Sequence, residues 1–276
     1  MGRLLAHDDL ITATAIAVPV LLSMLSWKRI LWLYGAACGC VIVVVVFCLR
    51  RYRYRSEVSR PEARYETDLA DRVLEESAAP SVAEPLPSAF EGLLLRRFLS
   101  RNECVALIAA AEECGFGTAQ YDKEYRGNLR LMTVDANLSA ALWARLRPHL
   151  TAEVTCALDH STWRADGLCE TWKWSKYLPQ PGRDAFAPHV DGTHWPEPSL
   201  RSFYSLNVYL NDDFAAGRTR FYRNPTSDEV VYTCQPEQGL ALVFRQPPSA
   251  KYLHDGEAVR DGAKYLWRCD VMYRKV

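Results

Sequence analysis

Short strand-length runs of residues after Gly167 restrict the fold of this chain more than any other feature. The runs alternate between apolar and polar residues or are wholly apolar, and they are broken by Pro, Gly, Asn and Asp, which favour turns. Closely spaced strands of this kind are typical of a jelly roll or barrel. We expect strands at residues 171–177, 202–210, 219–222, 239–244 and 264–273.

Two helices are expected ahead of these strands. Ser100 and Glu103 have the spacing of a capping box, and Gly115 supplies a stop signal, so one helix should lie between them. A second helix is expected at about 138–147, with Asn137 as its N-cap. The expected fold is therefore mainly β with flanking helices.

Two long runs without charged residues lie near the N-terminus, at residues 10–27 and 30–49. Each approaches the roughly 20 residues that a helix needs to cross a hydrocarbon core. We therefore predict a membrane anchor at residues 1–55, with one or two transmembrane helices and the lipid bilayer as a partner. Residues 56–88 are rich in Pro, Ala, Glu and Arg and poor in large apolar groups, which predicts a linker or stalk.

The rest of the chain, residues 89–276, is expected to be one domain, with a helical part at 89–166 and a jelly-roll core at 167–276. The composition of the whole chain argues against nucleic acid as a partner, because its 33 basic and 33 acidic residues give a net charge of zero and a nucleic-acid-binding protein usually has a basic excess. The 9 cysteines include no Cys-x-x-Cys pair, so we expect free thiols and not a structural zinc site. A disulfide would need an oxidising compartment.

His189 and Asp191 are two residues apart, so on a strand their side chains point the same way and can bind one metal ion. His254, from a later strand, would complete a set of two imidazoles and one carboxylate. Such a set leaves coordination positions open and suits Fe(II) oxygenases, although zinc can use it too. Lys264 follows His254 by ten positions and could hold the far carboxylate of an oxoacid. Taken alone, it could equally be a solvated strand residue.

Several short blocks between residues 97 and 273 occur in a recognisable order. They are Arg97 to Ser100, Phe186 to Gly192, Leu206 to Asn211, Gly217 to Phe221, His254 to Gly256, Gly262 to Tyr265 and Arg268 to Tyr273. Together they make residues 88–276 resemble the catalytic domain of the collagen-type prolyl 4-hydroxylases and their wider 2-oxoglutarate/Fe(II) oxygenase relatives. The resemblance implies a double-stranded β-helix, which is a cupin-like jelly roll.

The resemblance also implies an activity and a site. The enzyme would be a 2-oxoglutarate-dependent dioxygenase that hydroxylates a protein or peptide, by default at a prolyl residue. Its cofactors and cosubstrates would be Fe(II), 2-oxoglutarate, O2 and L-ascorbate. The catalytic iron ligands would be His189, Asp191 and His254, and the residues of the 2-oxoglutarate site would be Lys264, Tyr209, Tyr177 and Thr219. A β-branched residue at position 219 is also what a strand favours.

Two alternative functions and the side of the membrane are left open by the sequence. A zinc hydrolase could use the same three ligands, and a catalytically inactive, membrane-bound binding module could keep the same fold. Ala215-Ala216-Gly217 stands where many relatives have paired glycines, which bears on the substrate. We expect a membrane location, in the endoplasmic reticulum. The basic cluster at residues 50–55 favours a cytoplasmic domain, whereas the resemblance favours a lumenal one.

Overall fold

The computed structural model describes residues 61–75, 80–118, 125–180, 182, 184–224, 226–247 and 252–276. The membrane anchor expected at residues 1–55, including both runs at 10–27 and 30–49, lies outside these ranges. Within them, no helix has the length and apolar character that a membrane crossing requires.

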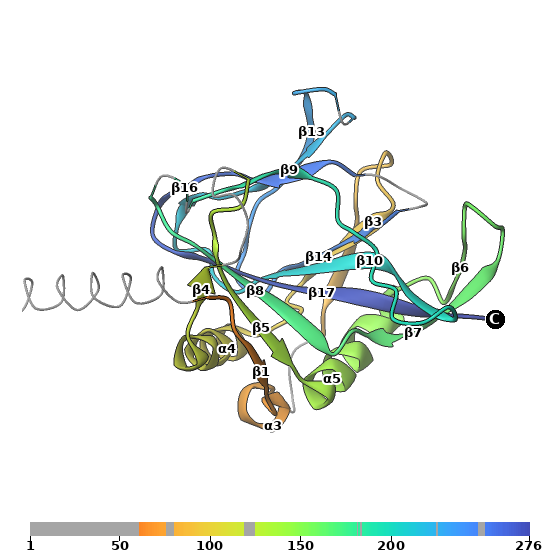
Figure 1. The fold of residues 1–276 in the computed structure, drawn as a ribbon, viewed down its shortest axis with the longest axis horizontal. Helices are drawn as coiled ribbons and strands as arrows, with labels where there is room; N and C mark the ends of the chain where they lie inside the picture. The colour runs from red at the N-terminus through yellow and green to blue at the C-terminus, as the bar shows by residue number, and fades with distance from the viewer. Residues whose placement is uncertain are drawn as a thin grey trace, which may run out of the picture. The chain divides into compact units, whose positions relative to one another are not determined.

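The mainly β architecture expected from the sequence is confirmed, and Figure 1 shows a larger and a smaller sheet on opposite sides of the domain. Four antiparallel strands form the centre of the larger sheet, in the order β8 (Thr171–Tyr177), β17 (Lys264–Lys275), β10 (Leu200–Tyr209) and β14 (Ala241–Arg245). Further strands extend it, namely β3 (Gly92–Arg96) and β2 (Val82–Pro85) beyond β14, and β5 (Leu129–Val134) and β1 (Arg64–Glu66) beyond β8.

The smaller sheet has four described strands, in the order β13 (Val230–Cys234), β12 (Thr219–Tyr222), β15 (His254–Gly256) and β9 (Phe186–His189). From β8 onward the chain passes repeatedly between the two sheets, which is the connectivity of a jelly roll. Two short strands, β11 (Ala215–Ala216) and β16 (Val259–Asp261), pair with each other. In the chain, β11 lies between β10 and β12, and β16 lies between β15 and β17. The strands expected at 171–177 and 219–222 have the predicted bounds.

Helices cover the outer face of the larger sheet (Figure 1). They are α3 (Ala70–Val73), α4 (Arg101–Cys114) and α5 (Ala136–Leu146), the last followed by a short 3-10 helix, η1 (Arg147–His149). Between helices and sheet lies a core that includes stacked Trp172 and Trp267, with ring centroids 3.7 Å apart. The six cysteines in the described part of the chain are all free thiols, as expected.

The helix signals were correct for α4 and displaced for α5. Ser100 Oγ accepts from the Glu103 amide, and the Glu103 carboxylate accepts from the Ser100 amide, which completes the predicted capping box. Helix α5 is capped by Asp135 and not by Asn137, because Asp135 Oδ1 accepts from the amide of Leu138 at 2.8 Å. The helix therefore begins at residue 136, ahead of the expected 138.

The expectation of a helical part at residues 89–166 was wrong in detail. This region holds α4 and α5 but also β3, β5 and three further strands, β4 (Gly117–Thr118), β6 (Glu153–Thr155) and β7 (Thr162–Leu168). Strand β5 pairs with β8 along its whole length. Its inward-facing Arg130 and Met132 line a cavity, so the strand lacks the simple alternation of polar and apolar residues that marks a half-buried strand.

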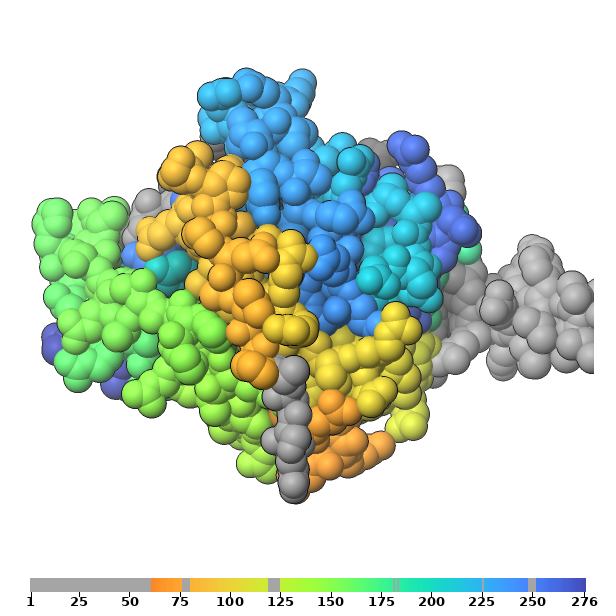
Figure 2. Space-filling view, turned by 180° about the vertical axis from the view of Figure 1, so that it is seen from behind, coloured from red at the N-terminus to blue at the C-terminus, as the bar shows by residue number. Residues whose placement is uncertain are grey.

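Residues 61–75 and 80–88 belong to the domain, contrary to the expected stalk at 56–88. Strand β1 pairs in parallel with β5, and β2 pairs with β3, so these segments extend the larger sheet. Figure 2 shows them, in orange, packed directly against later parts of the chain. Few apolar residues are needed, because backbone hydrogen bonds to the sheet supply much of the attachment, while Leu69, Val73 and Leu86 are buried.

Candidate active site

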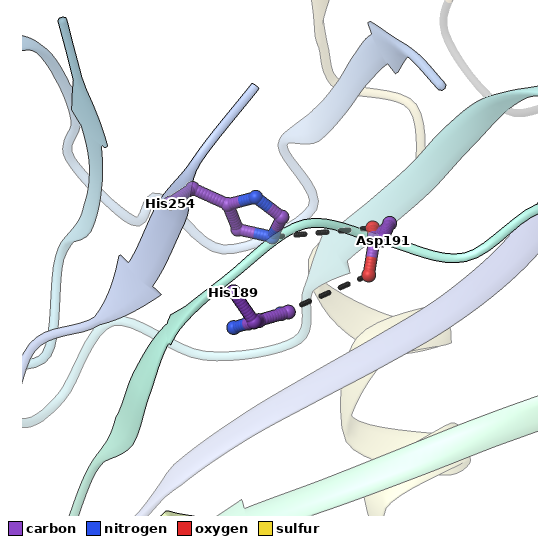
Figure 3. A group of neighbouring side chains, drawn as sticks. All are labelled: His189, Asp191 and His254. Atoms are coloured by element: carbon purple, nitrogen blue, oxygen red, sulfur yellow. Dashed lines mark ion pairs between the residues drawn. The ribbon is translucent and has the colours of Figure 1, made fainter. Parts of the chain in front are cut away.

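His189, Asp191 and His254 meet on the inner side of the smaller sheet, as the sequence predicts (Figure 3). Strands β9 and β15 pair with His189 opposite His254, and Asp191 follows just beyond the end of β9. His189 Nε2 lies 3.7 Å from Asp191 Oδ1, and His254 Nε2 lies 3.9 Å from Asp191 Oδ2. One ligand atom from each residue lies within 4.8 Å of the others.

Both imidazole rings are oriented by the backbone. His189 Nδ1 is 2.8 Å from the carbonyl oxygen of Ala187, and His254 Nδ1 is 3.0 Å from that of Tyr252. A ring that donates its Nδ1–H to a carbonyl keeps the lone pair of Nε2 for a metal ion. Burial and the neighbouring His254 lower the pKa of His189 to about 3, so its ring is neutral near pH 7.

Asp191 is ionised in spite of its burial. Burial alone would raise its pKa, but Arg268 and the two histidines outweigh that effect and hold the pKa well below its usual range. Its Oδ2 accepts hydrogen bonds from Ser205 Oγ at 2.5 Å and from Arg268 Nε at 3.1 Å. Two imidazoles with one carboxylate fit the donor set of an Fe(II) site with open positions.

A cavity of about 490 Å³ lies beside the three ligands, with walls from both sheets. Lys264 lines it from β17, and Arg268 lines it four residues further along the same strand. Four residues of strand span roughly 13 Å between Cα atoms. The cavity therefore has the metal-binding side chains and Arg268 at one end and the Lys264 ammonium towards the other.

Lys264 is a buried cation without a carboxylate partner. Its side chain is 1% exposed, and its Nζ donates to the carbonyl of Gly217 at 2.5 Å. The ammonium also lies 5.1 Å from the ring centroid of Tyr177 and 5.4 Å from that of Tyr209. No carboxylate of the described residues is within ion-pair distance of it, and burial lowers its pKa to about 8. A charge in such a place is unfavourable until an anion binds.

The other three residues predicted for 2-oxoglutarate are near Lys264 but differ in position. Tyr177 and Thr219 line the cavity. Tyr209 is fully buried behind Thr219 and does not line the cavity, and its hydroxyl is hydrogen-bonded to Thr219 Oγ1 at 2.7 Å. Tyr209 can therefore orient Thr219 and pack against Lys264, and its role in the 2-oxoglutarate site stays a prediction.

Sequence reasoning missed several polar residues of the cavity wall, among them Arg268 and Asn207. These two are cross-strand partners on β17 and β10. Asn207 is 4% exposed, and its Oδ1 is buried without a hydrogen-bond partner. The available signal was spacing, since residue 268 shares a strand face with 264 and residue 207 shares one with 209. Nothing in a single sequence separates the inner from the outer face of such strands.

No family model and no curated protein matches this chain. Solved structures do. A viral collagen prolyl hydroxylase from Paramecium Bursaria Chlorella virus-1, in complex with 2-oxoglutarate, has 19% identity and a TM-score of 0.42, over 64% of this chain and 92% of that one. A Pseudomonas putida prolyl-4-hydroxylase has 15% identity and a TM-score of 0.44, over 67% and 94%.

A third solved structure is a prolyl hydroxylase from Trichoplax adhaerens in complex with a peptide fragment of the hypoxia inducible factor oxygen degradation domain. It has 14% identity and a TM-score of 0.43, over 66% of this chain and 82% of that one. These structural neighbours are prolyl hydroxylases, the family that residues 88–276 resemble in sequence. At TM-scores below 0.5 they assign neither activity nor substrate to this chain.

Proposed function

We propose that this chain is an Fe(II)- and 2-oxoglutarate-dependent dioxygenase. The observation that carries the proposal is the presence, in one cavity, of three metal-binding side chains and a buried ammonium without a carboxylate partner. The three ligands alone would serve a zinc hydrolase equally well. Lys264 favours the oxygenase, because a hydrolase has no need for a buried cation at that place, whereas a dicarboxylate cosubstrate does.

The side chains have separate tasks in this proposal. His189, Asp191 and His254 would hold iron, which supplies the chemistry that couples conversion of 2-oxoglutarate and O2 into succinate and CO2 to hydroxylation of the substrate. Lys264 would pair with the far carboxylate of 2-oxoglutarate. Two aromatic rings shield the histidines from water: Phe186 stacks on His189 at 3.6 Å between centroids, and Phe221 stacks on His254 at 5.4 Å.

The substrate we propose is a protein or peptide, hydroxylated at a prolyl residue, with L-ascorbate as a reductant. Both proposals are supported by the ordered sequence blocks between residues 97 and 273 and not by a contact in the cavity. The double-stranded β-helix that the blocks imply agrees with the order of the strands in both sheets.

The test is iron-dependent release of succinate from 2-oxoglutarate by the full-length chain in detergent. We expect His189→Ala and Lys264→Met to abolish or strongly reduce it, and His160→Asn, which changes an exposed histidine, to leave it unchanged. Hydrolysis that needs zinc and no O2 would favour the hydrolase. Binding of 2-oxoglutarate and Fe(II) without succinate, across candidate peptides, would favour the inactive binding module. Unchanged turnover in His189→Ala would refute the metal site.

We also propose that the N-terminal region anchors the enzyme in a membrane, that of the endoplasmic reticulum. Support comes from the two uncharged runs at residues 10–27 and 30–49. Protease protection in sealed microsomes tests the side of the membrane. A protected domain places residues 89–276 in the lumen, and a digested one places them in the cytoplasm. Extraction of the chain by carbonate would refute the anchor.

A further inference from the structure

A buried polar network lies behind Asp191, with Arg268 at its centre. Arg268 Nε donates to Asp191 Oδ2 at 3.1 Å, while its NH2 group donates to Asp270 Oδ1, also at 3.1 Å. Asp270 is completely buried, and its Oδ2 accepts from Lys173 Nζ at 2.8 Å. One planar guanidinium thus bridges the buried carboxylate of Asp270 and the partly buried carboxylate of Asp191, and only Asp191 belongs to the metal-binding set.

The same network fixes the hydroxyl proton of Ser205. Ser205 Oγ accepts from Gln246 Nε2 at 2.8 Å and from Arg268 at 3.2 Å. A hydroxyl has two acceptor lone pairs and a single proton, so that proton is left for Asp191 Oδ2. Gln246 is itself fixed, because it accepts from Ser202 and donates to Asp270. Asp191 Oδ2 therefore receives two hydrogen bonds from donors that cannot easily turn away.

The other carboxylate oxygen of Asp191 is differently placed. Oδ1 lies 3.7 Å from His189 Nε2 and Oδ2 lies 3.9 Å from His254 Nε2, but only Oδ1 accepts no hydrogen bond from the residues that the structure describes. We propose that Arg268 is a positioning residue, which holds Asp191 Oδ2 away from the metal and makes Asp191 a ligand through Oδ1 alone. This inference rests on the metal site of the proposed function.

The consequence for the site is an extra open coordination position. A carboxylate that binds through both oxygens fills two positions, and a facial set of three ligands is useful because it leaves positions free. Lysine cannot replace the arginine here, because its single ammonium lacks the fork that reaches Asp191 and Asp270 together. Strand β17 thus carries Lys264 for one end of the cavity and Arg268 for the other.

The inference is tested by Co(II) binding to the full-length chain in detergent, without O2 or 2-oxoglutarate. The variants are Arg268→Gln and Arg268→Lys. The matched control is Arg145→Gln, which removes a guanidinium from buried Glu103; neither of these two residues lines the cavity. We expect both Arg268 variants to bind Co(II) about 10- to 100-fold more weakly. We also expect an altered visible Co(II) band, because a second carboxylate oxygen would take a coordination position that is otherwise open to solvent.

The control separates positioning from general damage. Arg145→Gln should lower the melting temperature and leave the Co(II) affinity and band as in the wild type. Wild-type affinity and band in Arg268→Gln would overturn the inference, as would equal losses in Arg145→Gln. If circular dichroism shows that Arg268→Gln does not fold, Arg268→Lys carries the test. A wild-type chain that binds Co(II) but releases no succinate with iron would refute the proposed function and leave this inference standing.

Discussion

Replacing Lys264 by Met should stabilise the ligand-free protein near pH 7. The pKa of Lys264 is lowered from 10.5 to about 8 by burial. At about 1.4 kcal/mol per pKa unit, the protonated side chain opposes folding by roughly 3 kcal/mol. Methionine removes this penalty but also the hydrogen bond to Gly217, which contributes about 1 kcal/mol. We therefore expect the free energy of unfolding of Lys264→Met to exceed that of the wild type by about 2 kcal/mol.

The pH dependence has a definite sign. Lys264 binds its proton more weakly in the folded chain than in the unfolded chain, so the penalty is fully present below about pH 8. It is relieved as the pH rises from about 8 to about 10.5, and wild-type stability should rise with pH in that window. Other groups that titrate there are common to both proteins and cancel in the difference. The advantage of Lys264→Met should therefore disappear by about pH 10.5.

The assay is urea unfolding of both full-length proteins at several pH values, with and without 2-oxoglutarate. A ligand at a hundred times its dissociation constant stabilises the folded state by about 2.7 kcal/mol. We expect this gain in the wild type and not in Lys264→Met. The reasoning is refuted if Lys264→Met is less stable than the wild type by the same amount at every pH. Equal stabilisation of both proteins by 2-oxoglutarate would remove Lys264 from the cosubstrate site.

Three further substitutions test other parts of the structure. Asn207→Leu should stabilise the ligand-free chain by about 1 kcal/mol in urea unfolding, because it removes a buried oxygen without a partner; a loss above about 1 kcal/mol would contradict this. Asp135→Ala should speed amide hydrogen exchange at residues 61–75, because Asp135 Oδ2 accepts from the Leu69 amide at 2.8 Å. Unchanged exchange would show that this hydrogen bond does not stabilise the attachment of residues 61–75 to the domain. Gly239→Ala should lower the melting temperature markedly, because φ of Gly239 is +82° and a Cβ would lie 2.1 Å from the Leu99 carbonyl oxygen. An unchanged melting temperature would contradict this backbone conformation at Gly239.

The sequence was a good guide where a rule of local spacing applies. The i, i+2 rule for strands predicts that His189 and Asp191 converge, and the structure confirms it. Helix α4 was predicted because a capping box depends only on residues three apart. Lys264 could be proposed from its spacing to His254, but its burial and its missing carboxylate partner could not be known from spacing.

Features that depend on pairing between distant strands were not predictable in this way. Arg268 contacts Asp191 because β17 of the larger sheet packs against the segment that follows β9 of the smaller sheet, and spacing along the sequence does not predict how the two sheets pack. Asn207 was missed for the same reason. The hydrogen bond between Tyr209 and Thr219 likewise joins strands of different sheets, β10 and β12, and no spacing rule predicts it. Strands β1 and β2 were missed because their attachment is largely through the backbone, which leaves little trace in composition.

Strands β1 and β2 determine where the chain can be shortened. A recombinant fragment that starts at residue 89 would lose both, and it would uncover residues 132–134 of β5 and the outer edge of β3. Uncovered sheet edges recruit strands from other molecules, so such a fragment is liable to precipitate however well its catalytic groups are preserved. Crystallisation and enzyme assays should therefore use fragments that begin ahead of Pro61.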